Sequence, residues 1–144
     1  MLMYKHTQPG YLTIGLLLSA AAVMVCLAIV TRAGVALRLG IVVLLAAAYV
    51  FGSLTTEVDH ERFRFWFGSR LIRRSFLLSE IRSCRPVTNR WWYGLGIHRM
   101  PDGWLYNVSG AQAVELTLQD GRKLRVGTDE PVVLCEAIRK AQQR

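Results

Sequence analysis

The residues best suited to chemistry in this sequence are arginines and aromatic side chains that lie close together between positions 55 and 100. Guanidinium groups bind phosphate oxygens, and aromatic rings settle at the boundary between lipid and water. The stretch carries an excess of positive charge, with nine arginines against four acidic residues: Arg62, Arg64, Arg70, Arg73, Arg74, Arg82, Arg85, Arg90 and Arg99 against Glu57, Asp59, Glu61 and Glu80. This composition favours a surface for anionic membrane lipids or for a protein partner.

We take one membrane or partner surface as the candidate site, and its members share a positive charge or an aromatic ring. They are Arg62, Arg64, Trp66, Arg73, Arg74, Arg90, Trp91, Trp92, Tyr93, His98 and Arg99. The competing interpretation is that the arginines form a solvated strand face and that the tryptophans fill the interior of a domain. The sequence leaves both interpretations open.

A short glycine motif lies beside this surface. Gly94 and Gly96, with His98 and Arg99 close by, could form a backbone nest for phosphate. A turn that needs positive φ angles explains both glycines equally well.

Catalytic and metal-binding motifs are missing from the sequence. The three histidines are isolated, and no HExxH, P-loop or dinucleotide-binding fingerprint occurs. Cys84 and Cys135 lie far apart and have no histidine at a metal-ligand spacing. We therefore expect no enzyme activity, no cofactor and no metal. A bond between these two cysteines stays open, although a cytoplasmic location would keep both reduced.

Two apolar segments dominate the first part of the sequence. Residues 11–30 carry no charge, and a helix of this length spans about 30 Å, the thickness of a bilayer core. Residues 38–55 reach nearly that length if the long side chain of Arg38 extends to the headgroups. We expect residues 1–54 to form a transmembrane helical hairpin. The alternatives are a cleaved signal peptide for the first segment and a buried or re-entrant helix for the second.

Positive charge near the helix ends predicts the orientation. The connecting loop holds Arg32 and Arg38, whereas six basic residues flank the outer ends: Lys5, Arg62, Arg64, Arg70, Arg73 and Arg74. Positive residues remain preferentially on the cytoplasmic side. We expect a multi-pass protein of the inner (plasma) membrane with both termini in the cytoplasm.

From residue 55 onward, apolar residues alternate with polar ones, which is typical of half-buried strands. Phe63, Phe65 and Phe67 should face a core, Arg74 should lie at a bulge or the end of a sheet, and Asp120-Gly121 suits a type I′ turn. Thr128 or Asp129 should cap a final amphipathic helix. We predict seven antiparallel strands, at residues 55–58, 62–67, 70–78, 81–87, 104–108, 114–119 and 122–127, with a long loop over 89–103. Closed by the helix, they describe a β-barrel over residues 55–144.

The order of these elements resembles bacterial membrane-anchored proteins with a pleckstrin-homology-like (PH-like) domain. The segments 71–81 (LIRRSFLLSEI) and 103–110 (GWLYNVSG) carry the resemblance. It implies a barrel at the cytoplasmic face and no enzyme activity. Pleckstrin domains that bind phosphoinositides share an Arg-x-Arg that Arg62 and Arg64 match. Their basic first strand and turn are replaced here by Glu57, Asp59 and Glu61, so headgroup recognition at that turn is not expected.

These observations predict an α+β membrane protein with a two-helix transmembrane hairpin followed by a PH-like seven-stranded barrel capped by a helix. We expect a non-catalytic interaction or assembly module at the cytoplasmic membrane face. The alternative is an accessory subunit of a membrane transport or secretion complex that acts through its helices. Expected partners are membrane lipids, including anionic ones, and an unidentified protein. Self-association is compatible with the sequence, and nucleic acid is not expected despite a net charge of +8.

Overall fold

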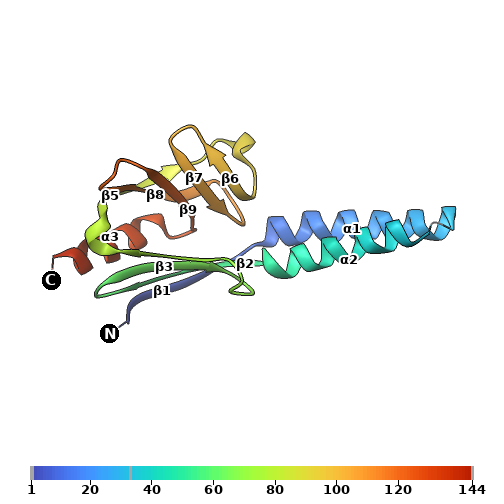
Figure 1. Cartoon of the computed structure of the whole chain (residues 1–144), viewed down its shortest axis with the longest axis horizontal. Coiled ribbons are helices and arrows are strands. Elements are labelled where there is room, and N and C mark those ends of the chain that lie inside the picture. The colour runs from blue at the N-terminus through green and yellow to red at the C-terminus, as the bar shows by residue number, and fades with distance from the viewer. Residues whose placement is uncertain (1, 33, 144) are drawn as a thin grey trace.

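A computed structural model describes residues 2–32 and 34–143, and it divides them into a protruding helix pair and a body of two sheets and one helix (Figure 1). The helix pair consists of α1 (Tyr11–Thr31) and α2 (Val35–Val50), which lie side by side. The chain enters and leaves the pair at one place, because the amide of Gly10 donates to the carbonyl of Gly52 at 2.8 Å. The helix pair therefore extends from a single point of the body.

Only α1 is long and apolar enough to cross a membrane among the helices of the described residues. α2 has 16 residues and falls short of a span. The expected two-helix transmembrane hairpin is therefore wrong. The reason lies at residues 53–55, which we assigned to the second span. They are drawn into a strand that pairs with neighbours on both sides, and this ends the helical segment at Val50.

The first sheet has four antiparallel strands in the order β1-β2-β3-β4. Its strands are β1 (Leu2–Pro9), β2 (Ser53–Asp59), β3 (Arg62–Phe67) and β4 (Arg73–Leu77). The sequence did not indicate β1, because its body-facing residues include His6 and Gln8 and so break the usual alternation. β1 forms because the helix pair returns the chain beside it, which brings β2 alongside.

The second sheet has five strands in the order β5-β8-β9-β7-β6. Its strands are β5 (Ile81–Thr88), β6 (Gly96–Met100), β7 (Gly103–Asn107), β8 (Gln112–Leu118) and β9 (Lys123–Gly127). β6 lies within the expected long loop over 89–103, which is therefore only partly a loop. β7 runs parallel to β9, and this close pairing needs Gly103, since a Cβ there would collide with the carbonyl oxygen of Lys123.

The expected closed barrel of seven antiparallel strands is wrong, because residues 2–32 and 34–143 form nine strands in two separate sheets. Within these described residues, no ladder joins the sheets where a barrel would close. Between β4 and β5 the chain passes through the short helix η1 (Leu78–Glu80) instead of continuing one sheet. The parallel pairing of β7 and β9 also departs from an antiparallel barrel. The architecture is α+β.

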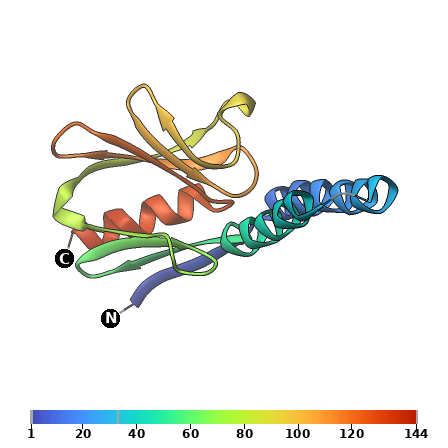
Figure 2. The ribbon, with the colours of Figure 1, turned by 45° about the vertical axis from the view of Figure 1, so that its right-hand side comes forward.

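The core lies between the two sheets and α3 (Pro131–Gln142), which Figure 2 shows beneath the five-stranded sheet. Phe63, Phe65 and Phe67 are fully buried, as the alternation predicted. The Phe65 ring meets the Tyr106 ring of the other sheet edge-on, with centroids 4.8 Å apart. Each buried phenylalanine contributes about 2 kcal/mol of hydrophobic stabilisation. The apolar stripe of α3 completes the core with Leu134, Ile138 and Ala141.

Two local predictions are corrected at the chain's end. The β8–β9 hairpin is present, but its turn is not type I′, because Gly121 has a positive φ of 85° and Asp120 does not. Asp120 instead accepts a hydrogen bond from the Arg122 amide at 3.0 Å, which organises a longer loop. α3 begins at Pro131 after Glu130, without a side-chain cap, so neither predicted residue caps it.

A disulfide joins Cys84 of β5 to Cys135 of α3, with Cα atoms 5.6 Å apart. The sequence left this bond open, with a cytoplasmic location favouring reduced thiols, and the structure forms it because both cysteines are buried against each other where α3 crosses the sheet. The guanidinium of Arg139 also donates to the carbonyl of Cys84 at 2.9 Å. α3 is therefore held to the five-stranded sheet covalently as well as by packing.

Candidate functional site

The structure separates the predicted surface into two groups on different sheets. Arg62, Arg64 and Trp66 lie on β3, and Arg73 and Arg74 lie on β4. The second group belongs to the other sheet, around the short helix η2 (Trp91–Tyr93) and on β6: Arg90, Trp91, Trp92, Tyr93, His98 and Arg99. Figures 1 and 2 place η2 and the β3–β4 turn on different sides of the base of the helix pair.

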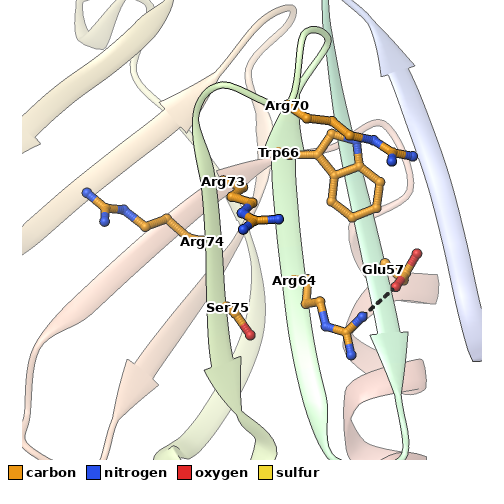
Figure 3. Close-up of a pocket in the computed structure, with 7 residues that line it drawn as sticks. All are labelled: Glu57, Arg64, Trp66, Arg70, Arg73, Arg74 and Ser75. Carbon is orange, nitrogen blue, oxygen red and sulfur yellow. Dashed lines mark hydrogen bonds and ion pairs between the residues drawn. The ribbon is translucent and has the colours of Figure 1, made fainter.

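Most of the first group lines an open hollow of about 570 Å³ on the outer face of the four-stranded sheet (Figure 3). We call it the arginine hollow, and its lining residues are Glu57, Arg64, Trp66, Arg70, Arg73, Arg74 and Ser75. Arg62, by contrast, is exposed at the far end of β3 and does not line it. The structure thus brings Arg64, Arg70 and Arg73 together around Trp66.

Strand register places these side chains next to one another. On β3, Arg64 and Trp66 are two residues apart and face outward, because Phe63, Phe65 and Phe67 take the inner positions. Ser75 pairs with Arg64, and Arg73 pairs with Trp66 across the β3–β4 ladder. The alternation that builds the core therefore also sets the spacing of the hollow.

Trp66 lies at the centre of the positive charges. The Arg70 guanidinium lies 5.1 Å from the ring centroid, and the Lys5 ammonium lies 5.7 Å from it. These are cation–π distances. Figure 3 shows the Arg70 side chain extending over the indole from the β3–β4 turn. A flat ring thereby holds the Arg70 guanidinium in place at one end of the hollow.

Only one arginine of the hollow has acidic partners among the described residues. Arg64 forms ion pairs with Glu57 at 3.3 Å and with Asp59. Burial tends to raise the pKa of Asp59, but hydrogen bonds from the amides of Glu61 and Arg62 and the charge of Arg64 together lower it. The salt bridges in the described part of the chain include no acid for Arg70, Arg73 or Arg74. The hollow therefore has a surplus of positive charge.

Arg70 and Arg74 differ from what their sequence positions suggested. We had placed Arg70 on a strand and left it out of the surface, whereas it occupies a turn with a positive φ of 59°. Its position directly after Gly68-Ser69 could have indicated this. Arg74 lies on the inner side of edge strand β4 yet stays exposed, which matches the predicted end-of-sheet position. Figure 3 shows it pointing away from the other arginines.

The second group presents tryptophans to the outside. Trp91 is 86% exposed and Trp92 is 56% exposed, so neither fills the interior of the body. The Arg90 guanidinium lies 5.0 Å from the Trp92 ring centroid. Trp91 also lines an apolar recess with Leu12 and Leu16 of α1. These rings therefore lie beside the first turns of the longest apolar helix.

The glycine motif does not form a clear anion site. Gly94 and Gly96 have positive φ angles of 73° and 94°. The Nε2 atom of His98 lies against the carbonyl oxygen of Leu95, and the imidazole stands beside Gly94. The positive φ angles thus agree with the turn interpretation, and a phosphate nest stays a prediction. Arg99 lies on β6 with an exposed side chain.

The outer face of the five-stranded sheet holds a different arrangement that the sequence did not reveal. Glu115 of β8 is 2% exposed and pairs in register with Arg85 on one side and Arg125 on the other. Arg85 Nη2 lies 2.6 Å from one carboxylate oxygen, and Arg125 Nε lies 2.8 Å from the other. Burial tends to raise the pKa of Glu115, but the hydrogen bonds from Arg125 and Arg85 outweigh it and lower the pKa.

Residues 2–32 and 34–143 contain no group of three His, Cys, Asp or Glu side chains that could hold a metal ion. The candidate site therefore offers arginine and hydroxyl groups, which bind anions, and tryptophan rings, which favour the lipid–water interface. No family model, curated protein or solved structure matches the chain. The resemblance to PH-like proteins thus stays a prediction.

Proposed function

We propose that this chain is a non-catalytic interaction module that is anchored in a membrane by α1 and holds its two-sheet body at the membrane surface. At 16 residues α2 is short of a span, so the anchor that we propose is α1 alone. The body displays its side chains to lipid headgroups and to a protein partner.

The exposure of α1 carries this proposal. Within the most apolar 18-residue stretch of α1, only 11% is buried in the structure, so α1 is not a core helix of the body. Ile29 and Val30 are 73% and 80% exposed, and Leu16 and Val23 are also exposed. Apolar surface of this extent is unfavourable in water and favourable in lipid. At 21 residues, α1 is about 31 Å long, which matches a bilayer core.

The position of β1 argues against a cleaved signal peptide. Cleavage after α1 would remove β1, whose register with β2 runs from Leu2 to Pro9. It would also remove the bonds from Gln8 to the Ser109 carbonyl at 3.0 Å and from Thr13 to the Val108 carbonyl at 2.6 Å. These contacts tie β1 and the first turn of α1 to the rest of the body, so α1 is integral to the fold.

The side chains near the base of the helix pair suit an interface between lipid and water. Trp91 is exposed beside Leu12 and Leu16 of α1. Near the other side of the base, the β3–β4 turn is bonded to the start of β2 through the Gly68 amide and the Ser53 carbonyl at 2.9 Å. That turn presents Arg70. Aromatic rings and basic side chains are favoured at the headgroup level.

Extraction of the full chain from membranes tests the anchor. The wild-type chain should stay with the membrane pellet after a carbonate wash and should need detergent to leave it. A variant with Leu18→Lys and Val23→Lys should be released, because both side chains are exposed midway along α1 and each lysine near the bilayer centre costs about 3 kcal/mol. A matched control with Val132→Lys and Val133→Lys alters exposed valines of α3 and should stay in the pellet.

Release of the wild-type chain by carbonate would contradict the proposal. Replacing α1 and α2 with an unrelated apolar helix pair then separates the two functional classes. A partner that co-purifies with the wild type should still co-purify if the body recognises it. Loss of that partner would favour an accessory subunit that acts through its helices.

A further inference from the structure

We propose that the arginine hollow is a binding site for a phosphate group, carried either by an anionic lipid headgroup or by a soluble phosphorylated molecule. Arg70 and Arg73 are the residues that bind it, and Trp66 orients Arg70. The lipid form of the ligand rests on the proposed membrane anchor, whereas the soluble form does not.

The first step concerns the ion pairing of Arg70 and Arg73. Among residues 2–32 and 34–143, Arg70 and Arg73 have no carboxylate within ion-pair distance, while the neighbouring Arg64 has two. Like charges gathered on one face repel each other and lower stability. Such a cluster is relieved when an anion binds among the guanidinium groups.

The second step is the geometry around Trp66. A guanidinium that stacks on an aromatic ring keeps its in-plane N–H groups free, so Arg70 can still bind phosphate oxygens in the stacked position. Arg73 lies directly across the ladder from Trp66, and Figure 3 shows its guanidinium pointing toward β3. The two arginines therefore border the same open space beside the ring.

The third step is the conformation of the β3–β4 turn. Arg70 adopts a positive φ of 59°, which a residue with a Cβ rarely adopts and which costs about 1 kcal/mol or more. The Arg70 amide donates to the Phe67 carbonyl at 2.7 Å, so the turn is held by the backbone. This conformation directs the side chain back over the indole instead of into solvent.

The fourth step is the place of the hollow in the molecule. The β3–β4 turn lies against the junction of α2 and β2, since a Cβ on Gly68 would lie 3.4 Å from the carbonyl oxygen of Tyr49. If α1 is embedded in a bilayer, this end of the hollow is level with the headgroups. Phosphate is the one anionic group that all common anionic phospholipids carry there.

The binding test uses the full chain in a neutral detergent with three soluble probes: inorganic phosphate, short-chain phosphatidylglycerol and short-chain phosphatidylcholine. We expect the wild type to bind at least one of the first two more tightly than the zwitterionic lipid. Arg70→Gln with Arg73→Gln should bind that probe about thirtyfold more weakly, because each arginine lost costs about fivefold. Both side chains are exposed, so the variant should fold.

Two further variants separate a built site from general attraction to positive charge. Arg82→Gln with Lys140→Gln removes the same charge from β5 and α3, outside the candidate surface, and should leave the affinity within about twofold. Arg70→Lys with Arg73→Lys keeps the charge but loses the planar fork, and it should still weaken binding severalfold. Equal affinity in the wild type and the Arg70→Gln with Arg73→Gln variant, or an equal loss in the Arg82 and Lys140 control, would overturn the proposal.

The probes also identify the source of the phosphate. Binding of inorganic phosphate in detergent indicates a soluble ligand, and binding of phosphatidylglycerol alone indicates a headgroup. Failure of the site and failure of the anchor remain distinguishable, because the double glutamine variant should stay in the carbonate pellet whatever it binds. A chain that leaves the membrane in carbonate yet binds inorganic phosphate keeps the site and loses the anchor.

Discussion

The two sheets of this molecule use arginine in opposite ways. On the five-stranded sheet, Arg85 and Arg125 enclose the buried carboxylate of Glu115, so their charges serve the fold. On the four-stranded sheet, Arg70 and Arg73 have no acidic partner among the described residues and surround Trp66. A count of arginines does not separate these cases. What separates them is whether strand register places a carboxylate beside the guanidinium.

The two sheets also differ in how firmly they hold α3. The five-stranded sheet is joined to it by the disulfide between Cys84 and Cys135. The four-stranded sheet reaches the start of α3 through β1, where Tyr4 donates to Glu130 at 3.1 Å and His6 contacts Asp129 at 2.6 Å. Burial, followed by the hydrogen bond to Glu130, raises the pKa of Tyr4, so its phenol stays a donor. α3 is thus attached more firmly to the five-stranded sheet than to the four-stranded sheet.

The largest expected effect comes from opening the disulfide. The bond closes a loop across 51 residues, and its removal should lower the free energy of unfolding by about 4 kcal/mol in the chain-entropy account. Chemical unfolding of the detergent-solubilised chain with and without reductant measures this. Cys26→Ala changes an exposed thiol on α1 and should leave the response to reductant intact. A wild-type chain that responds no more to reductant than Cys84→Ala with Cys135→Ala contradicts the assignment.

The same bond bears on the side of the membrane. Disulfides persist in oxidising compartments, whereas the arginines near the helix ends favour the cytoplasm for the body. The two observations favour opposite orientations. Alkylation of Cys84 in cells dissolved directly in denaturant decides between them. Denaturant exposes the buried cysteines, so a Cys84 that still does not react is held in the disulfide, which places the sheets on the oxidising side.

The next effect is expected at Glu115. Glu115→Gln leaves Arg85 and Arg125 without their shared carboxylate and should lower the free energy of unfolding by about 2 kcal/mol. The loss is smaller than for a fully buried ion triad, because the Arg85 side chain is 63% exposed. The matched change Glu57→Gln on the other sheet should cost less than about 1 kcal/mol, because Arg64 keeps Asp59. Equal losses in both variants would remove the contrast between the sheets.

Acid should weaken the five-stranded sheet through Glu115. The pKa of Glu115 is lower in the folded chain than its ordinary value of 4.5, so this group stabilises the fold above that pH. The stabilisation disappears as the pH falls below 4.5 and through the lowered value. Glu115→Gln should therefore flatten the decline of unfolding free energy in acid, as measured by denaturant titrations at several pH values. An unchanged decline in this variant would contradict the role of Glu115.

The sequence predicted those parts of the fold that depend on local alternation. Phe63, Phe65 and Phe67 occupy the core, and the β8–β9 hairpin forms, because each needs only its own pattern and a nearby turn. β1 and the parallel β7–β9 pairing depend on distant contacts. Neither has a local signature, and the closed barrel failed because strand order across 144 residues is not a local property.

The candidate site was predictable to the same extent. Alternation on β3 placed Arg64 and Trp66 on the outer face, and the structure agrees. It could not show that Arg70 turns back over Trp66, because that needs a positive φ at a residue other than glycine. Nor could it show that Glu115 neutralises Arg85, because their proximity follows from the β5–β8 register. The site thus depends on tertiary contacts more than the core pattern does.

The smallest expected effect on stability tests most directly whether the two sheets use their arginines differently. Arg70→Gln with Arg73→Gln removes two arginines that repel each other and that have no acidic partner in the described part of the chain. The free energy of unfolding should therefore change by less than about 0.5 kcal/mol. Loss of the cation–π contact with Trp66 opposes the relief of repulsion. Denaturant unfolding without phosphate or anionic lipid measures the net change. A loss as large as that of Glu115→Gln would mean that these arginines serve the fold, since residues kept for a ligand should cost little stability in its absence.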